Sequence, residues 1–102
     1  MGRARNESAM IRPAIQALYA MGCYVWRQNT GRARGVQYGV NGCPDIIGLT
    51  RNGRFIGVEL KFGKNKQQPE QERFQQRLEE KNGIYILAYS LDDIMKHAEV
   101  IL

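Results

Sequence analysis

Histidine and cysteine are scarce in this 102-residue chain, which has one histidine, His97, and two cysteines, Cys23 and Cys43, without a Cys-x-x-Cys pair. A structural zinc site takes about four such ligands, so zinc binding is poorly supported. We expect both cysteines to be reduced and partly buried thiols, with one disulfide between them as the alternative.

Long apolar runs are also missing. None approaches the roughly 20 residues that span a bilayer, and the N-terminal residues 1–7 lack the apolar stretch of a secretory signal. We therefore expect a cytoplasmic protein that does not associate with membranes. The length fits one domain over residues 1–102, and 43% hydrophobic with 25% charged residues is typical of a globular protein.

Lysine is absent through Arg54, and this half of the chain contains only two acidic residues, Glu7 and Asp45. Its basic residues are all arginines, namely Arg3, Arg5, Arg12, Arg27, Arg32, Arg34, Arg51 and Arg54. The guanidinium group presents a rigid fork of donors that suits phosphate oxygens. An arginine excess within a net charge of +5 therefore favours a nucleic-acid partner. A basic surface without a ligand is the alternative.

Apolar periodicity predicts a first helix through residues 10–19, capped by Asn6 or Ser8 and ended by Met21-Gly22. Pro13 falls inside this pattern. Because proline is tolerated only in the first turn, either the regular helix begins near Arg12 or an earlier turn is kinked.

The rest of the chain alternates between predicted strands and helices. Strands are expected at residues 23–27, 45–50, 54–62 and 84–88, and helices from Pro69 to Asn82-Gly83 and from Leu91 onward. Residues 28–43 are polar and glycine-spaced, which indicates a long loop or a loose hairpin. The order αβββαβα predicts an α/β fold with a mixed central sheet flanked by helices. A helical crossover should make the last two strands parallel.

Glu59 and Lys61 are two residues apart on a predicted strand, so their side chains leave the same face. Asp45 opens the neighbouring strand, and pairing of the two strands would bring its carboxylate near Glu59. Two adjacent carboxylates are usually held ionised by a divalent cation, and Mg²⁺ needs few protein ligands. A nearby lysine can act on the attacking water or on developing phosphate charge.

Each of these residues also has an ordinary structural interpretation. Glu59 and Lys61 would then form an exposed ion pair on a wet sheet face, Asp45 would be a turn residue after Pro44, and Gln71 a surface glutamine. Their joint occurrence, in this order and in an arginine-rich chain, weakens these alternatives.

The same residues resemble a known family. Gly42-Cys43-Pro44-Asp45, Val58-Glu59-Leu60-Lys61 on the next strand and Pro69-Glu70-Gln71 at a helix start are similar to the VRR-NUC family of PD-(D/E)XK nucleases. The similarity spans nearly the whole chain. It implies a restriction-endonuclease-like core, and it places the chain among small standalone members from phages and bacteria, which work in the host or bacterial cytoplasm.

The resemblance implies a role for each matching residue. Asp45 and Glu59 would bind Mg²⁺ or Mn²⁺ with the backbone carbonyl of Leu60, and Lys61 would act on the nucleophilic water. Gln71 would orient Lys61 or a phosphate, and Glu7 would add a metal contact through water. Small members of the family act as homodimers and resemble Holliday junction resolvases.

Other residues are candidates for DNA contacts. We expect Arg27, Arg32 and Arg34 to contact phosphates, with solvated loop charges as the alternative, and Asn29 or Gln28 to hydrogen-bond DNA. Trp26 lies between apolar neighbours in a predicted strand, so we expect it in the core, with stacking on a base as the alternative.

These observations predict a metal-dependent DNA endonuclease that is selective for branched structures such as Holliday junctions or flaps. A chain this small cannot easily enclose a duplex or thread an end. A non-catalytic nucleic-acid-binding module is the alternative, but a carboxylate pair would repel the phosphates that such a module must hold. A sequence-specific restriction enzyme is less favoured because the chain has no additional recognition element.

Overall fold

The computed structural model describes residues 7–28 and 31–102. Helix α1 spans Glu7–Ala20 and contains Pro13 in its interior. The helix therefore begins well before Arg12, and the expected start near Arg12 is wrong. Gly22, with φ of 87°, ends the helix in the left-handed conformation that glycine adopts without strain.

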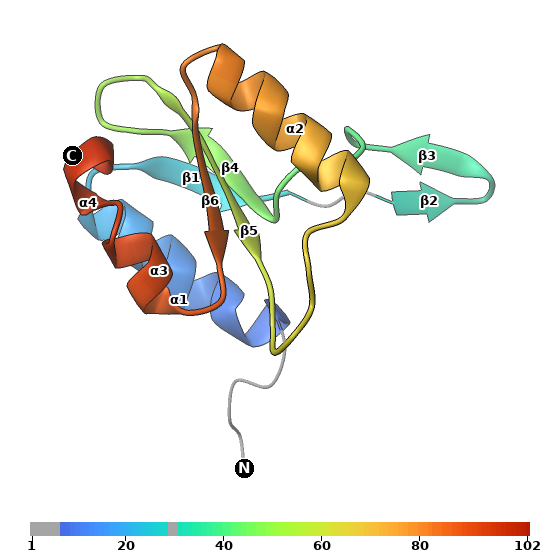
Figure 1. Cartoon of the computed structure of the whole chain (residues 1–102), viewed down its shortest axis with the longest axis horizontal. Coiled ribbons are helices and arrows are strands. Elements are labelled where there is room, and N and C mark those ends of the chain that lie inside the picture. Colours follow the sequence, from blue (N-terminus) through green and yellow to red (C-terminus); the bar gives the residue numbers. More distant parts are fainter. Residues whose placement is uncertain (1–6, 29–30) are drawn as a thin grey trace.

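Four strands form the central sheet in the order β1-β4-β5-β6, shown in Figure 1. They are β1 (Tyr24–Arg27), β4 (Ile46–Leu49), β5 (Phe55–Leu60) and β6 (Ile84–Ala88). β4 is antiparallel to both β1 and β5, whereas β5 and β6 are parallel. Helix α2, Pro69–Glu80, makes the crossover between the two parallel strands. The predicted mixed α/β sheet flanked by helices is confirmed.

The main core lies on the sheet face covered by α1 and the C-terminal helices. Val25, Ile46, Val58 and Ile86, one from each strand, are almost fully buried there and pack in one cluster with residues of α1 such as Leu18. Asp45 and Glu59 alternate with Ile46 and Val58 along their strands, so their side chains leave the opposite face of the sheet.

The last helical segment is divided, where the sequence predicted one helix. It consists of α3 (Leu91–Met95) and α4 (Ala98–Ile101), separated by Lys96 and His97. The His97 amide donates to the carbonyl of Ile94, three residues back, which tightens the turn and redirects the chain. The redirection brings both Ile94 and Ile101 into the main core.

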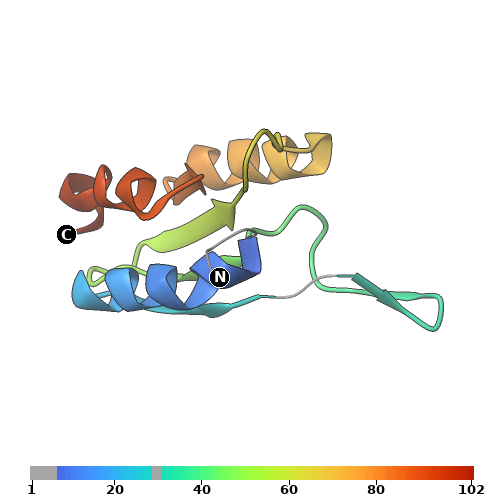
Figure 2. The same cartoon turned by 90° about the horizontal axis from the view of Figure 1, so that it is seen from below.

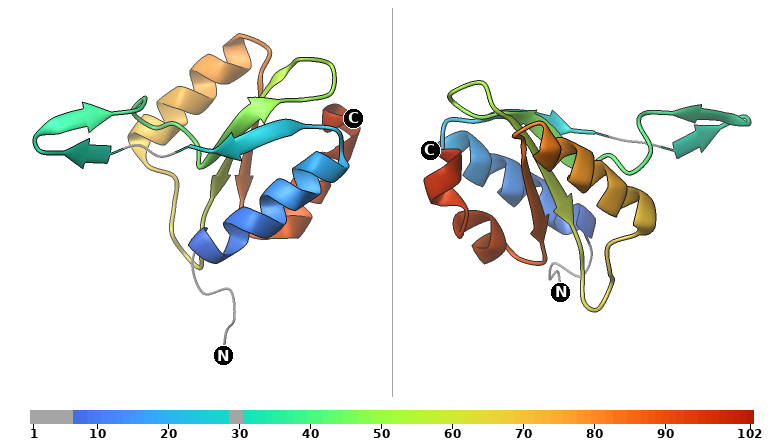
Figure 3. Two further views of the ribbon diagram at one scale, coloured as in Figure 1. Left: turned by 180° about the vertical axis from the view of Figure 1, so that it is seen from behind. Right: turned by 45° about the horizontal axis from the view of Figure 1, so that its top comes forward.

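Helix α2 covers the opposite face of the sheet, as comparison of Figures 1 and 3 makes clear: α2 is in front in the first view and α1 in front in the reverse view. A Cβ atom on Gly57 would lie 2.8 Å from Pro44 Cγ and 3.6 Å from Leu78 Cδ2. The missing side chain at Gly57 thus lets the residues before β4 and helix α2 approach the sheet closely.

Residues 31–38 form a separate hairpin of β2 (Gly31–Ala33) and β3 (Val36–Tyr38). Arg34 and Gly35 make its two-residue turn, both at positive φ, as tight hairpins require. Figures 1 and 2 show this hairpin projecting from the body of the molecule. Of the two expectations for residues 28–43, the hairpin is therefore the observed one.

Within the parts of the chain that the structure describes, no helix has both the length and the apolar character that crossing a membrane requires.

Candidate active site

Asp45 lies immediately before β4, directly across from the end of β5. Ile46 pairs with Val58, so the next pair in this antiparallel register is Asp45 with Glu59. Directly opposed residues share a sheet face, with Cβ atoms about 4.5–5.5 Å apart. Oδ2 of Asp45 also accepts a hydrogen bond of 2.8 Å from the amide of Leu60. This contact extends the strand pairing and holds the Asp45 side chain beside β5, so Asp45 does more than terminate a turn.

Glu59 and Lys61 are both buried, with relative exposures of 4% and 7%. Nζ of Lys61 lies 3.8 Å from Oε2 of Glu59. An exposed ion pair on a wet sheet face would not be buried, so that interpretation is wrong. Burial of a charged pair is expensive and is a poor route to stability. A fold that retains one at the end of a strand has an arrangement suited to chemistry.

Gln71 connects the first turn of α2 to Glu59. Its Oε1 accepts a hydrogen bond of 2.8 Å from the amide of Gln68, the residue before the helix. Its Nε2 donates to Oε2 of Glu59 at 3.0 Å. Since the capping contact takes the oxygen, the nitrogen must face the carboxylate, which fixes the orientation of the amide. Gln71 is therefore not an ordinary surface glutamine.

Tyr85 and Cys43 also border the site, and sequence reasoning did not single them out. Burial raises the pKa of the Tyr85 phenol to about 12, and the charges of Glu59 and Asp45 act in the same direction. The pKa of Cys43 is raised by burial first and then by the same two carboxylates. Tyr85 reaches the site only because β6 pairs with β5 in parallel, opposite Gly57. No local motif in the sequence predicts that proximity.

The carboxylates of Asp45 and Glu59 are oxygen donors, the type of ligand that Mg²⁺ and Mn²⁺ prefer. Two carboxylates, from Asp45 and Glu59, converge from adjacent strands, and their joint effect on Cys43 and Tyr85 marks a region of concentrated negative charge. Among residues 7–28 and 31–102, no group of three or more histidine, cysteine or acidic side chains could hold a metal ion. Mg²⁺ commonly uses one or two carboxylates and fills its remaining positions with water and phosphate oxygens.

The remaining expected metal contacts are placed as follows. The Leu60 amide points toward Asp45, and because the amide and carbonyl of a strand residue face the same neighbour, its carbonyl lies on that side too. The Leu60 side chain is buried in the main core on the other face. Glu7 is the first residue of α1, and its side chain lies outside what the structure describes.

The structure does not gather the predicted DNA-contacting residues into one cluster. Arg27 is exposed at the end of β1, one residue before Gln28, whose amide donates to the Asp45 carbonyl at 2.7 Å. Arg34 is exposed at the tip of the projecting hairpin. Asn29 and the Arg32 side chain lie outside the described residues. Arg27 is thus close to Asp45 along the strand pair, but it is paired with Ile46, so its side chain leaves the sheet face opposite to that of Asp45 and Glu59. Arg34 belongs to a different part of the surface.

Trp26 is not a core residue, contrary to expectation. Its relative exposure is 43%, and Tyr24 on the same strand face is 64% exposed, whereas the intervening Val25 is buried. The expected strand is present as β1, but the prediction that Trp26 lies in the core is wrong. Tyr24 and Trp26 lie on the same sheet face as α2, but α2 does not cover the part of this face that β1 forms.

Comparison of the chain with family models, with curated proteins and with solved structures found no match. The resemblance to VRR-NUC nucleases therefore remains a prediction from the motif residues. The contacts of Glu59 with Lys61 and Gln71 are an observation that does not depend on this resemblance.

Proposed function

We propose that this protein is a metal-dependent endonuclease that hydrolyses phosphodiester bonds in DNA. The observation that carries the proposal is the buried contact of Glu59 with Lys61 and Gln71, with Asp45 directly across the strand pair. A binding module gains nothing from a desolvated carboxylate pair in a basic chain, because such a pair repels phosphates unless a cation neutralises it.

In this proposal each residue of the site has a separate role. Asp45 and Glu59 would hold the metal, with the Leu60 carbonyl as a third oxygen. Lys61 is aligned through Glu59, so its ammonium group is positioned to hold the attacking water or to stabilise charge on the scissile phosphate. Gln71 orients Glu59 from the capped start of α2 and thereby acts as a positioning residue.

Mg²⁺ or Mn²⁺ in this site would lower the pKa of water and neutralise charge that develops on the phosphate. The fit rests on the carboxylates of Asp45 and Glu59, which occupy directly opposed positions on adjacent strands. Hard, oxygen-preferring cations match this donor set.

The resemblance extends the proposal to the substrate and to assembly. Small VRR-NUC proteins are similar to Holliday junction resolvases, which implies a branched or flap DNA substrate, a homodimer with two active sites, and a role in phage or bacterial replication, recombination or repair. Light scattering of the purified protein tests the dimer directly, because a dimer has twice the chain mass of 11.7 kDa.

Cleavage of labelled four-way junction, flap, single-stranded and plain duplex DNA, with Mg²⁺, with Mn²⁺ and with EDTA, tests the activity. We expect metal-dependent cutting that is lost in Asp45→Ala and Lys61→Ala while DNA binding persists. Gln71→Ala should slow cleavage by roughly 10-fold to 100-fold, the usual effect of removing an outer partner of a metal ligand. The matched control is Gln76→Ala, which removes an exposed glutamine of α2 whose amide donates to Oε2 of Glu80 at 3.5 Å.

If the wild-type protein binds these DNAs but cuts none of them with either metal, the catalytic assignment fails and the chain is a binding module. If Gln76→Ala slows cleavage as much as Gln71→Ala does, the assigned role of Gln71 is wrong.

A further inference from the structure

An exposed aromatic ladder follows the outward face of β1. Tyr24 and Trp26 are 64% and 43% exposed, and Leu49, paired with Tyr24 on β4, is 41% exposed. Helix α2 covers the β5–β6 half of this face through Leu78, which lies against Gly57 and Gly83. Among the described residues, none of the helices packs over the β1–β4 half. Large aromatic side chains left open on a sheet face mark an interaction surface.

The rings are held in a defined arrangement. Tyr24 and Trp26 meet edge to face, with centroids 5.7 Å apart, and Tyr19 makes a second edge contact with Tyr24 at 6.4 Å. Nε1 of Trp26 donates to Oε1 of Gln28 at 3.3 Å, which ties the edge of the indole ring to the next residue on the same face. A ring held by its edges keeps a flat face available for stacking.

The ladder leads directly to the carboxylate site. Trp26 pairs with Ile47, and Gln28 continues this register opposite Asp45, to which its amide is bonded. Trp26 and Asp45 are thus diagonal neighbours on one sheet face, about 7–8 Å apart. A base stacked on Trp26 would place its own backbone close to Asp45 and Glu59.

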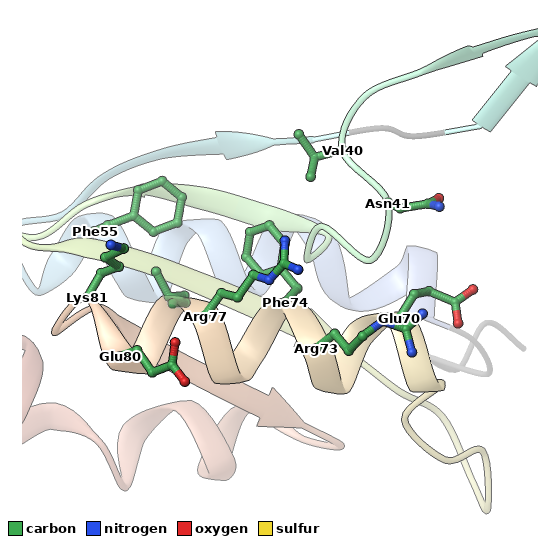
Figure 4. A pocket seen from close by; sticks show the side chains of 10 residues that line it. Val40, Asn41, Phe55, Glu70, Arg73, Phe74, Arg77, Glu80 and Lys81 are labelled. Atoms are coloured by element: carbon green, nitrogen blue, oxygen red, sulfur yellow. The ribbon is translucent and has the colours of Figure 1, made fainter.

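A groove of about 760 Å³ lies beside α2 next to this face, and its lining contains three basic side chains, Arg73, Arg77 and Lys81, and two acidic ones, Glu70 and Glu80. Figure 4 shows Phe55 and Phe74 along it, with Arg73 and Arg77 on the helix and Val40 on the opposite side. Phe55 pairs with Leu49, which in turn pairs with Tyr24, so groove and ladder are neighbours across the sheet. Aromatic faces for bases beside cations for phosphates are the composition of single-strand binding surfaces.

Continuity with the candidate active site favours a nucleic-acid strand over a second copy of the chain as the occupant, because Trp26 and Asp45 share one sheet face. The neighbouring groove adds cations for phosphates, Arg73 and Arg77. An unpaired nucleic-acid strand offers the opposite charge together with flat apolar bases.

We propose that Tyr24 and Trp26 form a stacking platform for unpaired bases next to the scissile phosphate. The preferred substrate is then DNA with an unpaired strand, such as a flap, rather than a fully paired duplex. This inference rests on the proposed nuclease function and deepens it.

Trp26 is the only tryptophan in the chain, so its fluorescence reports on the platform without a label. The titration uses a single-stranded oligonucleotide, a blunt duplex of the same sequence and a flap, all in EDTA to prevent cleavage. We expect strong quenching by the single strand and the flap and weak quenching by the duplex. Trp26→Ala and Tyr24→Ala should each lower single-strand affinity by roughly 5-fold to 100-fold, measured by anisotropy of labelled DNA. Trp26→Phe should restore most of it.

The control is Met95→Ala, which shortens an exposed apolar side chain of α3 rather than of this sheet face. Thermal melting verifies that each variant is folded. If Trp26→Ala still prefers single-stranded DNA as the wild-type protein does, the proposed stacking platform is wrong. If the protein nevertheless shows metal-dependent cleavage, the nuclease proposal stands. A change from dimer to monomer in Trp26→Ala, with strand preference unaltered, would instead assign this face to a second copy.

Discussion

Asp45 and Glu59 bring two negative charges together at the ends of adjacent strands. Such a pair lowers the stability of the folded protein, because like charges repel until a cation binds. The free energy of unfolding of single variants measures this effect without any assay of catalysis.

Asp45→Asn keeps an acceptor for the Leu60 amide but removes one charge. We expect the free energy of unfolding in EDTA to rise by about 0.5–2 kcal/mol. Added Mg²⁺ should stabilise the wild-type protein and leave the variant unaffected, because only an intact site binds the ion. Urea unfolding with and without Mg²⁺ measures both effects. Asp92→Asn, an exposed acid on α3, is the control for a general change of charge, and an equal gain there would refute the local explanation.

Tyr85 makes stability depend on pH in the alkaline range. Its phenol has a pKa of about 12 in the folded protein, against an ordinary value near 10. The unfolded chain therefore releases this proton at lower pH than the folded protein does. The stabilisation, on the order of 2 kcal/mol, is fully present below pH 10 and is lost as pH rises toward 12.

Denaturant unfolding at pH 9 and pH 11 tests this prediction. The free energy of unfolding should fall less between the two pH values in Tyr85→Phe than in the wild-type protein. Tyr24→Phe, an exposed tyrosine, should behave like the wild type. Identical pH dependence in Tyr85→Phe and the wild-type protein would rule out a perturbed Tyr85.

Among the elements, β4, β5 and α2 position the site through one tight junction. Pro44 lies against Gly57, and Leu78 of α2 lies on the other side of the same glycine. Gly57 has no positive φ, so the requirement at this position is for space rather than for an unusual backbone conformation.

Gly57→Ala should push Pro44 away from the sheet and displace Asp45 with it. We expect a loss of about 1–3 kcal/mol in stability, as for other overpacked positions, together with reduced cleavage. Because the close contact is with the proline ring, Pro44→Ala should relieve part of the effect. Urea unfolding of both single variants and the double variant measures this coupling, and strictly additive changes would show that the contact with Pro44 is unimportant.

At the scale of the whole molecule, a net charge of +5 is spread over a body and a projecting hairpin. An isolated two-stranded hairpin is marginally stable by itself. The basic hairpin, with Arg34 exposed at its tip, is therefore suited to rest on an anionic partner.

Salt dependence of DNA binding tests the contribution of this arm. Each lost phosphate contact should reduce the slope of log affinity against log salt by about 0.9 for duplex DNA. We expect Arg34→Asn to do so, since asparagine tolerates the left-handed conformation at this position. Lys96→Ala removes the same charge from α3, where Lys96 pairs with Asp93. Equal slopes for the two variants would show that net charge matters and the hairpin does not.

Much of the fold follows from local patterns in the sequence. Short apolar runs bounded by turn residues predict β4, β5 and β6, and Asn82-Gly83 correctly ends α2 before β6. The order of elements indicates the parallel pairing, because a helix joins β5 to β6. The pairing of Asp45 with Glu59 also follows, since residues 51–53 form the turn of a hairpin whose register sets both carboxylates in one row.

Local patterns do not show which face of a strand is buried or which distant residues meet, and long-range packing decides both. Alternation along β1 separates Val25 from Tyr24 and Trp26, but only the position of α2 determines that the aromatic side stays exposed. The bond from Gln71 to Glu59 and the approach of Tyr85 join elements that are distant in the chain. The sequence by itself thus determined which residues form the candidate site and which strand positions share a face. The tertiary structure decided which face is buried, because burial depends on what packs against a strand and not on the strand itself.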